Sequence, residues 1–139
     1  MSSSLAARFL ALSSLALAVP MVSAADAASA GDAGRGQVLF QQACALCHAV
    51  AGGQGPSLGG VMGRRAATGA NFTYTKALTD SGLTWDAATL DRFLANPTTA
   101  VPGTNMVVPV AGANDRRDII ACVATIKAAP AGAAPALAT

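Results

Sequence analysis

The stretch Cys44-Ala45-Leu46-Cys47-His48 decides how the rest of the chain is interpreted. The pattern C-x-x-C-H is the attachment sequence of a c-type haem. Two thiols at this spacing lie on one turn of helix, so both can bond vinyl groups on the same edge of a porphyrin. The next side chain, His48, can then reach the iron from beneath the ring. The motif therefore predicts a protein built around one covalently attached haem.

The composition suits a small domain with a cofactor at its centre. The chain has 139 residues, of which 53% are hydrophobic, 12% charged and only 4% aromatic. Much of the hydrophobic fraction is alanine, so large side chains are too few to fill a core well, and a flat apolar cofactor would supply the missing volume. The net charge of +2 argues against nucleic acid as a partner and against a polybasic membrane attachment.

Residues 1–25 have the pattern of an export signal. Arg8 is the only charge, an almost unbroken apolar run covers 9–22, and small residues around 22–25 offer a cleavage site. The run is short for a membrane span, so we expect a cleaved signal peptide rather than a retained anchor, and no stable membrane insertion after cleavage. Export would place the protein in the periplasm, where bacteria attach c-type haem.

Four segments are expected to be helical, and three of them have apolar residues at helical spacing. Gly36 lies on the apolar face of the first segment, where glycine costs about 1 kcal/mol relative to alanine. We therefore expect another helix to cross close to its backbone. The expected helices are 32–46 with Asp32 as N-cap, 75–80, a helix with Thr84 as N-cap that stops at Asn96-Pro97, and 114–129 with the apolar stripe Ile119, Ile120, Val123 and Ile126.

Loops are expected in most of the remaining sequence. Residues 49–63 are rich in glycine, 64–74 have no clear period, and 98–112 contain prolines that argue against a strand ladder. The fold class is therefore all-α, with three main helices, a short helix and long loops wrapped around one haem. We expect residues 26–129 to form this domain and the Ala/Pro-rich residues 130–139 to be a disordered tail.

The second axial ligand of the iron has few candidates. His48 is the only histidine, so methionine, lysine or no ligand remain. Once the signal is removed, the only methionines are Met62 and Met106. A methionine is most often a gap-filling core residue. Met106 nevertheless follows the turn Pro102-Gly103-Thr104-Asn105, which can direct a side chain inward, and we favour it as the ligand.

Over residues 32–127 the sequence resembles the class I cytochromes c, close to the group of bacterial cytochrome c2 and mitochondrial cytochrome c. The resemblance rests on several motifs in the family's order and near its spacing, which is more specific than the haem motif alone. Besides Cys44 to His48 they are Gly36 and Phe40, Gly55-Pro56-Ser57-Leu58, Gly63-Arg64, Phe72-Thr73-Tyr74-Thr75, Leu83-Thr84-Trp85, Asn96-Pro97 and Pro102-Gly103-Thr104-Asn105-Met106.

The resemblance implies a role for each matching residue. Cys44 and Cys47 would form the thioethers of haem c, with His48 and Met106 as the axial ligands. The carbonyl of Pro56 would accept the other ring proton of the histidine and so orient it. Each of the remaining three could also be a solvated charge or a core aromatic, but the resemblance places them near the buried haem propionates: Arg64, Tyr74 and Trp85.

Several positions depart from the family or stand apart from its motifs. Phe93 occupies a position where the family often has tyrosine, so a hydroxyl near the distal methionine is missing. Cys122 is an odd cysteine, which we interpret as a small buried residue rather than a reactive or dimerising thiol. Mitochondrial members carry lysines around the exposed haem edge. The corresponding positions here are Ala43, Thr98, Thr99 and Asn105, so docking through lysines is not expected.

These features predict a soluble, monomeric, single-haem electron carrier of a respiratory or photosynthetic chain, and not an enzyme. With both axial positions filled, the iron has no vacant site for a substrate, and the electron would pass by outer-sphere transfer at the exposed haem edge. The expected partners are redox proteins such as a cytochrome bc1-type complex, an oxidase, a peroxidase or a reaction centre, met in brief encounters with small interfaces.

Three alternatives compete with this interpretation. A small haem enzyme or gas-binding sensor needs an open sixth position on the iron. A zinc site would have only Cys122 as a soft fourth ligand beside the Cys44 to His48 motif. A thioredoxin-like C-x-x-C oxidoreductase expects a βαβ surrounding that this sequence lacks.

Overall fold

The computed structural model describes residues 30–48 and 53–128. The expected signal peptide, 1–25, and the expected tail, 130–139, lie outside the described residues. In the described part the regular elements are helices, and the only strand-like pairing there is an isolated antiparallel bridge between Arg65 and Thr84. The helices are α2 (Ala33–Ala43), α3 (Lys76–Asp80), α4 (Ala87–Ala95), α5 (Pro97–Ala100) and α6 (Ala113–Thr125). The expected all-α fold class is confirmed.

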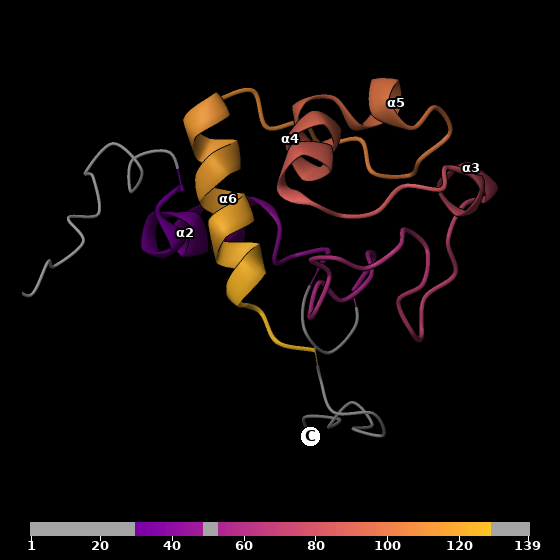
Figure 1. Ribbon diagram of the computed structural model, residues 1–139, viewed down its shortest axis with the longest axis horizontal. Coiled ribbons are helices and arrows are strands. Elements are labelled where there is room, and N and C mark those ends of the chain that lie inside the picture. Colours follow the sequence, from indigo (N-terminus) through magenta and orange to yellow (C-terminus); the bar gives the residue numbers. More distant parts are fainter. Residues whose placement is uncertain (1–29, 49–52, 129–139) are drawn as a thin grey trace, which may run out of the picture.

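The crossing of α2 and α6 is the main helix–helix contact, and Figure 1 shows α6 passing across α2. Gly36 is buried at this crossing. A Cβ built on Gly36 would overlap the backbone carbonyl of Asp118 and lie 3.0 Å from the Cβ of Cys122. The prediction that another helix crosses close to Gly36 is therefore confirmed.

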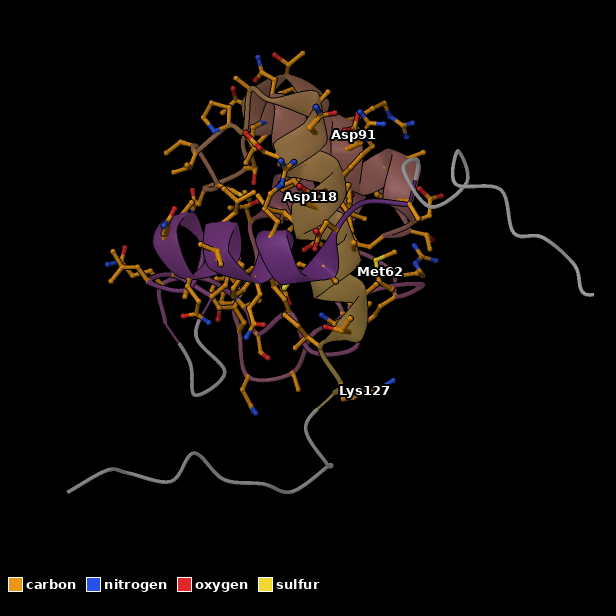
Figure 2. All side chains as sticks on the ribbon, turned by 90° about the vertical axis from the view of Figure 1, so that its left-hand side faces the viewer. Met62, Asp91, Asp118 and Lys127 are labelled. Atoms are coloured by element: carbon orange, nitrogen blue, oxygen red, sulfur yellow. The ribbon has the colours of Figure 1, made fainter. Side chains whose placement is uncertain are left out.

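A buried carboxylate joins the start of α2 to α6. The backbone N–H of Asp32 donates to the Asp118 carboxylate at 2.7 Å, and the guanidinium of Arg35 pairs with the same carboxylate. The side chain of Asp118 is only 6% exposed, and Figure 2 places it on α6 just above α2. The hydrogen bond from the backbone N–H of Asp32 holds the pKa of Asp118 below its usual value, and the guanidinium of Arg35 lowers it further.

Two helices end earlier than expected from the sequence. The first helix ends at Ala43 rather than near residue 46, because the N–H groups of Cys44 and Ala45 both donate to the carbonyl of Phe40 and the chain then turns away from the helix. The last helix ends at Thr125 rather than near residue 129. Its start and its stripe agree with expectation, since Ile119, Ile120 and Val123 are buried.

The N-cap expected for α4 is wrong by two residues. Asp86, not Thr84, accepts a hydrogen bond from the N–H of Thr89, at 2.7 Å. Thr84 is instead engaged in the bridge with Arg65. The loop expected after Asn96 also begins with a short helix, α5, because Asn96 accepts from the N–H of Thr99 at 3.1 Å and Pro97 suits the first helical position.

The core draws on loops as much as on helices. In Figure 1 the long connection between α2 and α3 lies below α4 and α5, and α6 closes the α2 side. No helix within 30–48 and 53–128 is long and apolar enough to cross a membrane. The buried apolar residues are Phe40, Val61, Ala66, Trp85, Phe93, Leu94, Val101, Ile119, Ile120, Cys122 and Val123.

Candidate functional site

The motif Cys44 to His48 forms a tight turn directly after α2. The N–H groups of Cys47 and His48 donate to the carbonyl of Cys44, at 3.1 and 2.9 Å. Both thiols are free and half-buried, whereas Leu46 between them is 87% exposed. Burial, helped by the neighbouring thiols of Cys122 and Cys47, raises the pKa of Cys44. The turn thus places two thiols and an imidazole side by side.

The ring of His48 is held in one orientation by the following loop. Its Nδ1 lies 2.8 Å from the carbonyl oxygen of Pro56, which can only accept, so Nδ1 carries the proton. The other nitrogen, Nε2, is then the unprotonated one that can bind a metal. The expected hydrogen bond between these two residues is present.

Gly55 completes this arrangement, and its role was not recognised from the sequence. Its N–H donates to the carbonyl of Cys47 at 2.8 Å. A Cβ on Gly55 would lie 2.8 Å from Cε1 of His48, so any side chain would push the imidazole aside. The only sequence signal was the glycine-rich composition of the loop, which does not say which glycine faces the histidine.

Arg64 carries a buried donor that has no protein partner in the described ranges. Its two terminal nitrogens donate to the carbonyls of Gly59 and Ser57, at 3.0 and 3.5 Å. Its Nε is buried and makes no hydrogen bond there. A buried guanidinium N–H left without an acceptor is costly, so this atom points to an acceptor that is not part of the polypeptide.

Tyr74 and Trp85 each come close to Arg64 in the fold. The small Gly69 lets the hydroxyl of Tyr74 and a terminal nitrogen of Arg64 approach the same point, where a Cβ would meet both. The backbone N–H of Trp85 donates to the carbonyl of Arg64 at 3.0 Å. The structure therefore brings together the three residues expected near the propionates.

The two candidate methionines are alike in burial. Met106 and Met62 are both half-buried and both pack against the core. The N–H of Met106 donates to the hydroxyl of Thr104 at 3.3 Å, within a turn that contains Gly103 at φ 92°. Figure 2 shows Met62 beside the lower half of α6. The choice of Met106 as the ligand remains a prediction from the sequence.

A structural zinc site finds no support in the arrangement of the side chains. Among the residues that the structure describes, no group of three or more His, Cys, Asp and Glu is arranged to hold a metal ion. Cys122 is buried in the α2–α6 crossing, and burial raises the pKa of its thiol. This agrees with the interpretation of Cys122 as a small core residue.

Comparison with known proteins decides the family. Residues 31–121 match the family described as cytochrome c oxidase, cbb3-type, subunit III. The chain is 44% identical over 110 residues to cytochrome c2 of Rhodomicrobium vannielii, covering 76% of this chain and 87% of that protein. The chain belongs to the class I c-type cytochromes. Cytochrome c of Chlamydomonas reinhardtii is 41% identical, covering 68% of this chain and 88% of that protein.

A solved structure agrees with this membership. Cytochrome cH from Methylobacterium extorquens superposes with a TM-score of 0.64 at 41% identity, covering 68% of this chain and 99% of that protein. Class I c-type cytochromes bind haem c covalently. The residues of this cytochrome fit haem c. Two free thiols adjoin an imidazole whose Nε2 is available to the iron, and the buried Nε of Arg64 has no acceptor among the described residues.

Proposed function

We propose that this c-type cytochrome is a single-haem electron carrier that passes one electron at a time between redox proteins and transforms no substrate. The observation that carries the proposal is the hydrogen bond from His48 to Pro56 beside the two half-buried thiols. It fixes the imidazole as a rigid ligand. Rigid ligands favour electron transfer, since little has to move when the charge of the iron changes.

Each residue of the site has one task in this proposal. Bound haem supplies an iron that accepts and releases one electron. Cys44 and Cys47 would hold the ring by thioether bonds, and His48 and Met106 would be the two protein ligands of the iron, so that no position would remain for a substrate. A thioether ligand in an apolar pocket favours the reduced state and raises the potential. Hydrogen bonds to the propionates would come from Arg64, Tyr74 and Trp85.

The location and the partners follow from the same proposal. Residues 1–25 would direct export and be removed, residues 26–129 would form the working domain, and 130–139 would remain a disordered tail. The carrier would then act as a monomer in the periplasm. Its partners would be redox proteins of a respiratory or photosynthetic chain, such as a cytochrome bc1-type complex, an oxidase, a peroxidase or a reaction centre.

One preparation of the exported holoprotein tests the proposal. We expect the haem to stay with the polypeptide under denaturing electrophoresis, and a spectroelectrochemical titration to give one reversible one-electron step at positive potential. A second test offers peroxide and oxygen to the reduced protein. Haem that separates from the chain, or sustained turnover of either oxidant at the rate of a haem enzyme, would overturn it.

A further inference from the structure

The chain that follows α6 packs on the loop that supports Arg64. Ile126 is the first residue after the helix and has extended backbone angles. Its carbonyl accepts a hydrogen bond from the backbone N–H of Gly60 at 2.9 Å. In Figure 1 this segment leaves α6 and runs toward the long connection between α2 and α3, and Figure 2 shows Lys127 beyond the end of α6. We call residues 126–128 the strap.

Two glycines let the strap lie directly against the loop. A Cβ on Gly59 would lie 2.5 Å from the carbonyl oxygen of Lys127, and a Cβ on Gly60 would lie 2.9 Å from the Cβ of Ala128. Gly59 is buried, although it belongs to a loop. The strap and the loop are therefore packed against each other with no room for a side chain between them.

Gly59 links the strap to Arg64. Its carbonyl accepts a hydrogen bond from one terminal nitrogen of Arg64 at 3.0 Å, and the carbonyl of Ser57 accepts from the other at 3.5 Å. The guanidinium is planar, so two fixed nitrogens also fix the direction of its third donor, Nε. This Nε is the buried donor that has no acceptor among the described residues. The loop under the strap thus determines where Nε is directed.

We propose that the strap positions Arg64 for the haem propionate and thereby helps to set the reduction potential. The inference rests on the proposed function, in which Arg64 donates to a propionate. While the strap covers the loop, the guanidinium acts in a poorly solvated site, where electrostatic interactions are strong. When the strap is displaced, the loop can move and water screens the charge. The strap is a positioning element, because it acts on the iron only through Arg64.

A methyl group placed under the strap tests this without changing any charge. Gly60→Ala would push the strap away at Ala128, so the protection of the residue-60 N–H against hydrogen exchange should fall about tenfold in the holoprotein. The reduction potential should fall by at least about half of the shift that Arg64→Met produces, and it should vary with pH near neutrality as in that variant. NMR measures the exchange, and spectroelectrochemical titration measures the potential.

Gly82→Ala is the matched control for backbone strain. Gly60 and Gly82 both have φ 63°, which disfavours alanine at either position. A Cβ on Gly82 meets no atom of the described residues within 4 Å. This variant carries the same strain away from the strap, so the potential and the protection of residue 60 should stay at the wild-type values.

A second change should rescue the first. Gly60→Ala combined with Ala128→Gly removes the methyl group at 2.9 Å and leaves the Cα of Ala128 at 3.5 Å, an ordinary contact. The protection of residue 60 should return to within about twofold of wild type, and the potential should return with it. Recovery of both quantities would tie the potential to the contact between strap and loop.

Two shortened chains test the strap independently of Gly60. A stop after Thr125 removes the strap and all that follows, whereas a stop after Ala128 leaves the strap in place. We expect the first to lower the potential and make it vary with pH, and the second to keep the wild-type potential. Lys127→Ala in the full chain should also keep the wild-type potential, because the charge of this exposed side chain is screened by solvent.

Three results would overturn the role of the strap alone. Unchanged protection of residue 60 in Gly60→Ala would show that the strap does not cover the loop. Lost protection with an unchanged potential and pH profile would show that the strap is only structural. An equal fall in potential in Gly82→Ala would assign the effect to backbone strain. A wild-type protein that fails to take up and release one electron reversibly would instead overturn the proposed function, and this inference with it.

Discussion

The imidazole Nδ1 of His48 lies 2.8 Å from the carbonyl oxygen of Pro56, eight residues further along the chain. The contact ties the haem motif to the loop that follows it, and it selects the tautomer whose Nε2 can bind iron. Gly55 makes the contact possible by leaving room for the ring. The proximal side of the site is therefore preformed by the polypeptide.

Two glycines of α2 should respond oppositely to alanine. Gly36→Ala places a methyl group against the backbone carbonyl of Asp118, so we expect a loss of about 2–3 kcal/mol in the free energy of unfolding. Gly34→Ala meets only the side chain of Asp32, at 3.3 Å, and should gain about 0.5–1 kcal/mol from helix propensity. Denaturant unfolding of the holoproteins measures both. An unchanged free energy of unfolding for Gly36→Ala would contradict the close crossing of α2 and α6.

Asp118 should make the stability of the protein sensitive to acid. Its pKa is held below the usual 3.8, first by the N–H of Asp32 and then by Arg35. A carboxylate with a lowered folded-state pKa stabilises the fold above its unfolded pKa, and this contribution is lost as the pH falls through the folded value. Asp118→Asn should therefore be less stable at neutral pH and lose less stability on acidification below pH 3.8.

Denaturant unfolding at neutral pH and at pH below 3.8 compares the two proteins. Asp115→Asn, on the same helix but 48% exposed and 4.0 Å from Arg35, is the control and should differ little from wild type. Parallel pH profiles for wild type and Asp118→Asn would show that the carboxylate is not coupled to folding.

Arg64 should tune the reduction potential, and its neighbour Arg65 should not. Arg64 has a buried Nε without a partner in the described part of the chain, whereas Arg65 is exposed. Arg64→Met removes a positive charge that we propose to lie beside the propionates, and its loss would make the oxidised iron easier to form. The potential should fall on the order of tens of millivolts. Without the guanidinium, the propionate should take up a proton more readily. The reduction potential of Arg64→Met should therefore also vary with pH near neutrality.

Spectroelectrochemical titration over a range of pH values measures this effect, with Arg65→Met as the matched control. The control should keep the wild-type potential, because solvent screens its charge. Equal shifts in the two variants would mean that Arg64 acts through overall charge rather than through a buried hydrogen bond.

Cys122 should be unreactive in the native holoprotein. It is buried in the α2–α6 crossing, and burial raises the pKa of its thiol, so little thiolate forms near neutral pH. With Cys44 and Cys47 bonded to haem, a chromogenic disulfide reagent should detect no thiol before denaturation and one afterwards. One thiol that reacts rapidly in the native protein would restore the interpretation of Cys122 as a redox-active or dimerising group.

Local signals in the sequence predicted the main helices well. Asp32 as N-cap and Gly36 at a helix crossing could each be predicted from the residues of one helix alone. The N-cap of α4 could not be chosen in this way, because Thr84 and Asp86 are both suitable residue types. The pairing of Thr84 with Arg65, far away in the sequence, decides between them. Similarly, Asn96-Pro97 is typical of a helix stop, although the same two residues begin α5.

The site was predictable where its residues are neighbours in the sequence. Cys44, Cys47 and His48 form one motif, and the family resemblance supplied Pro56 and Arg64. Gly55 and Gly69 were missed as supports of the site, since their importance depends on the His48 ring and the Tyr74 hydroxyl that face them across the fold. Composition marks a glycine as permissive, but it does not show what approaches it.

The central claim is that His48 and Met106 close both axial positions of one iron. Carbon monoxide added to the reduced holoprotein tests this most directly, with Met106→Ala and Met62→Ala compared with wild type by absorption spectroscopy. We predict no binding at neutral pH by wild type or Met62→Ala, and rapid, complete binding by Met106→Ala together with a lowered potential. Rapid, complete binding by the wild-type protein, or by Met62→Ala in place of Met106→Ala, would contradict the account.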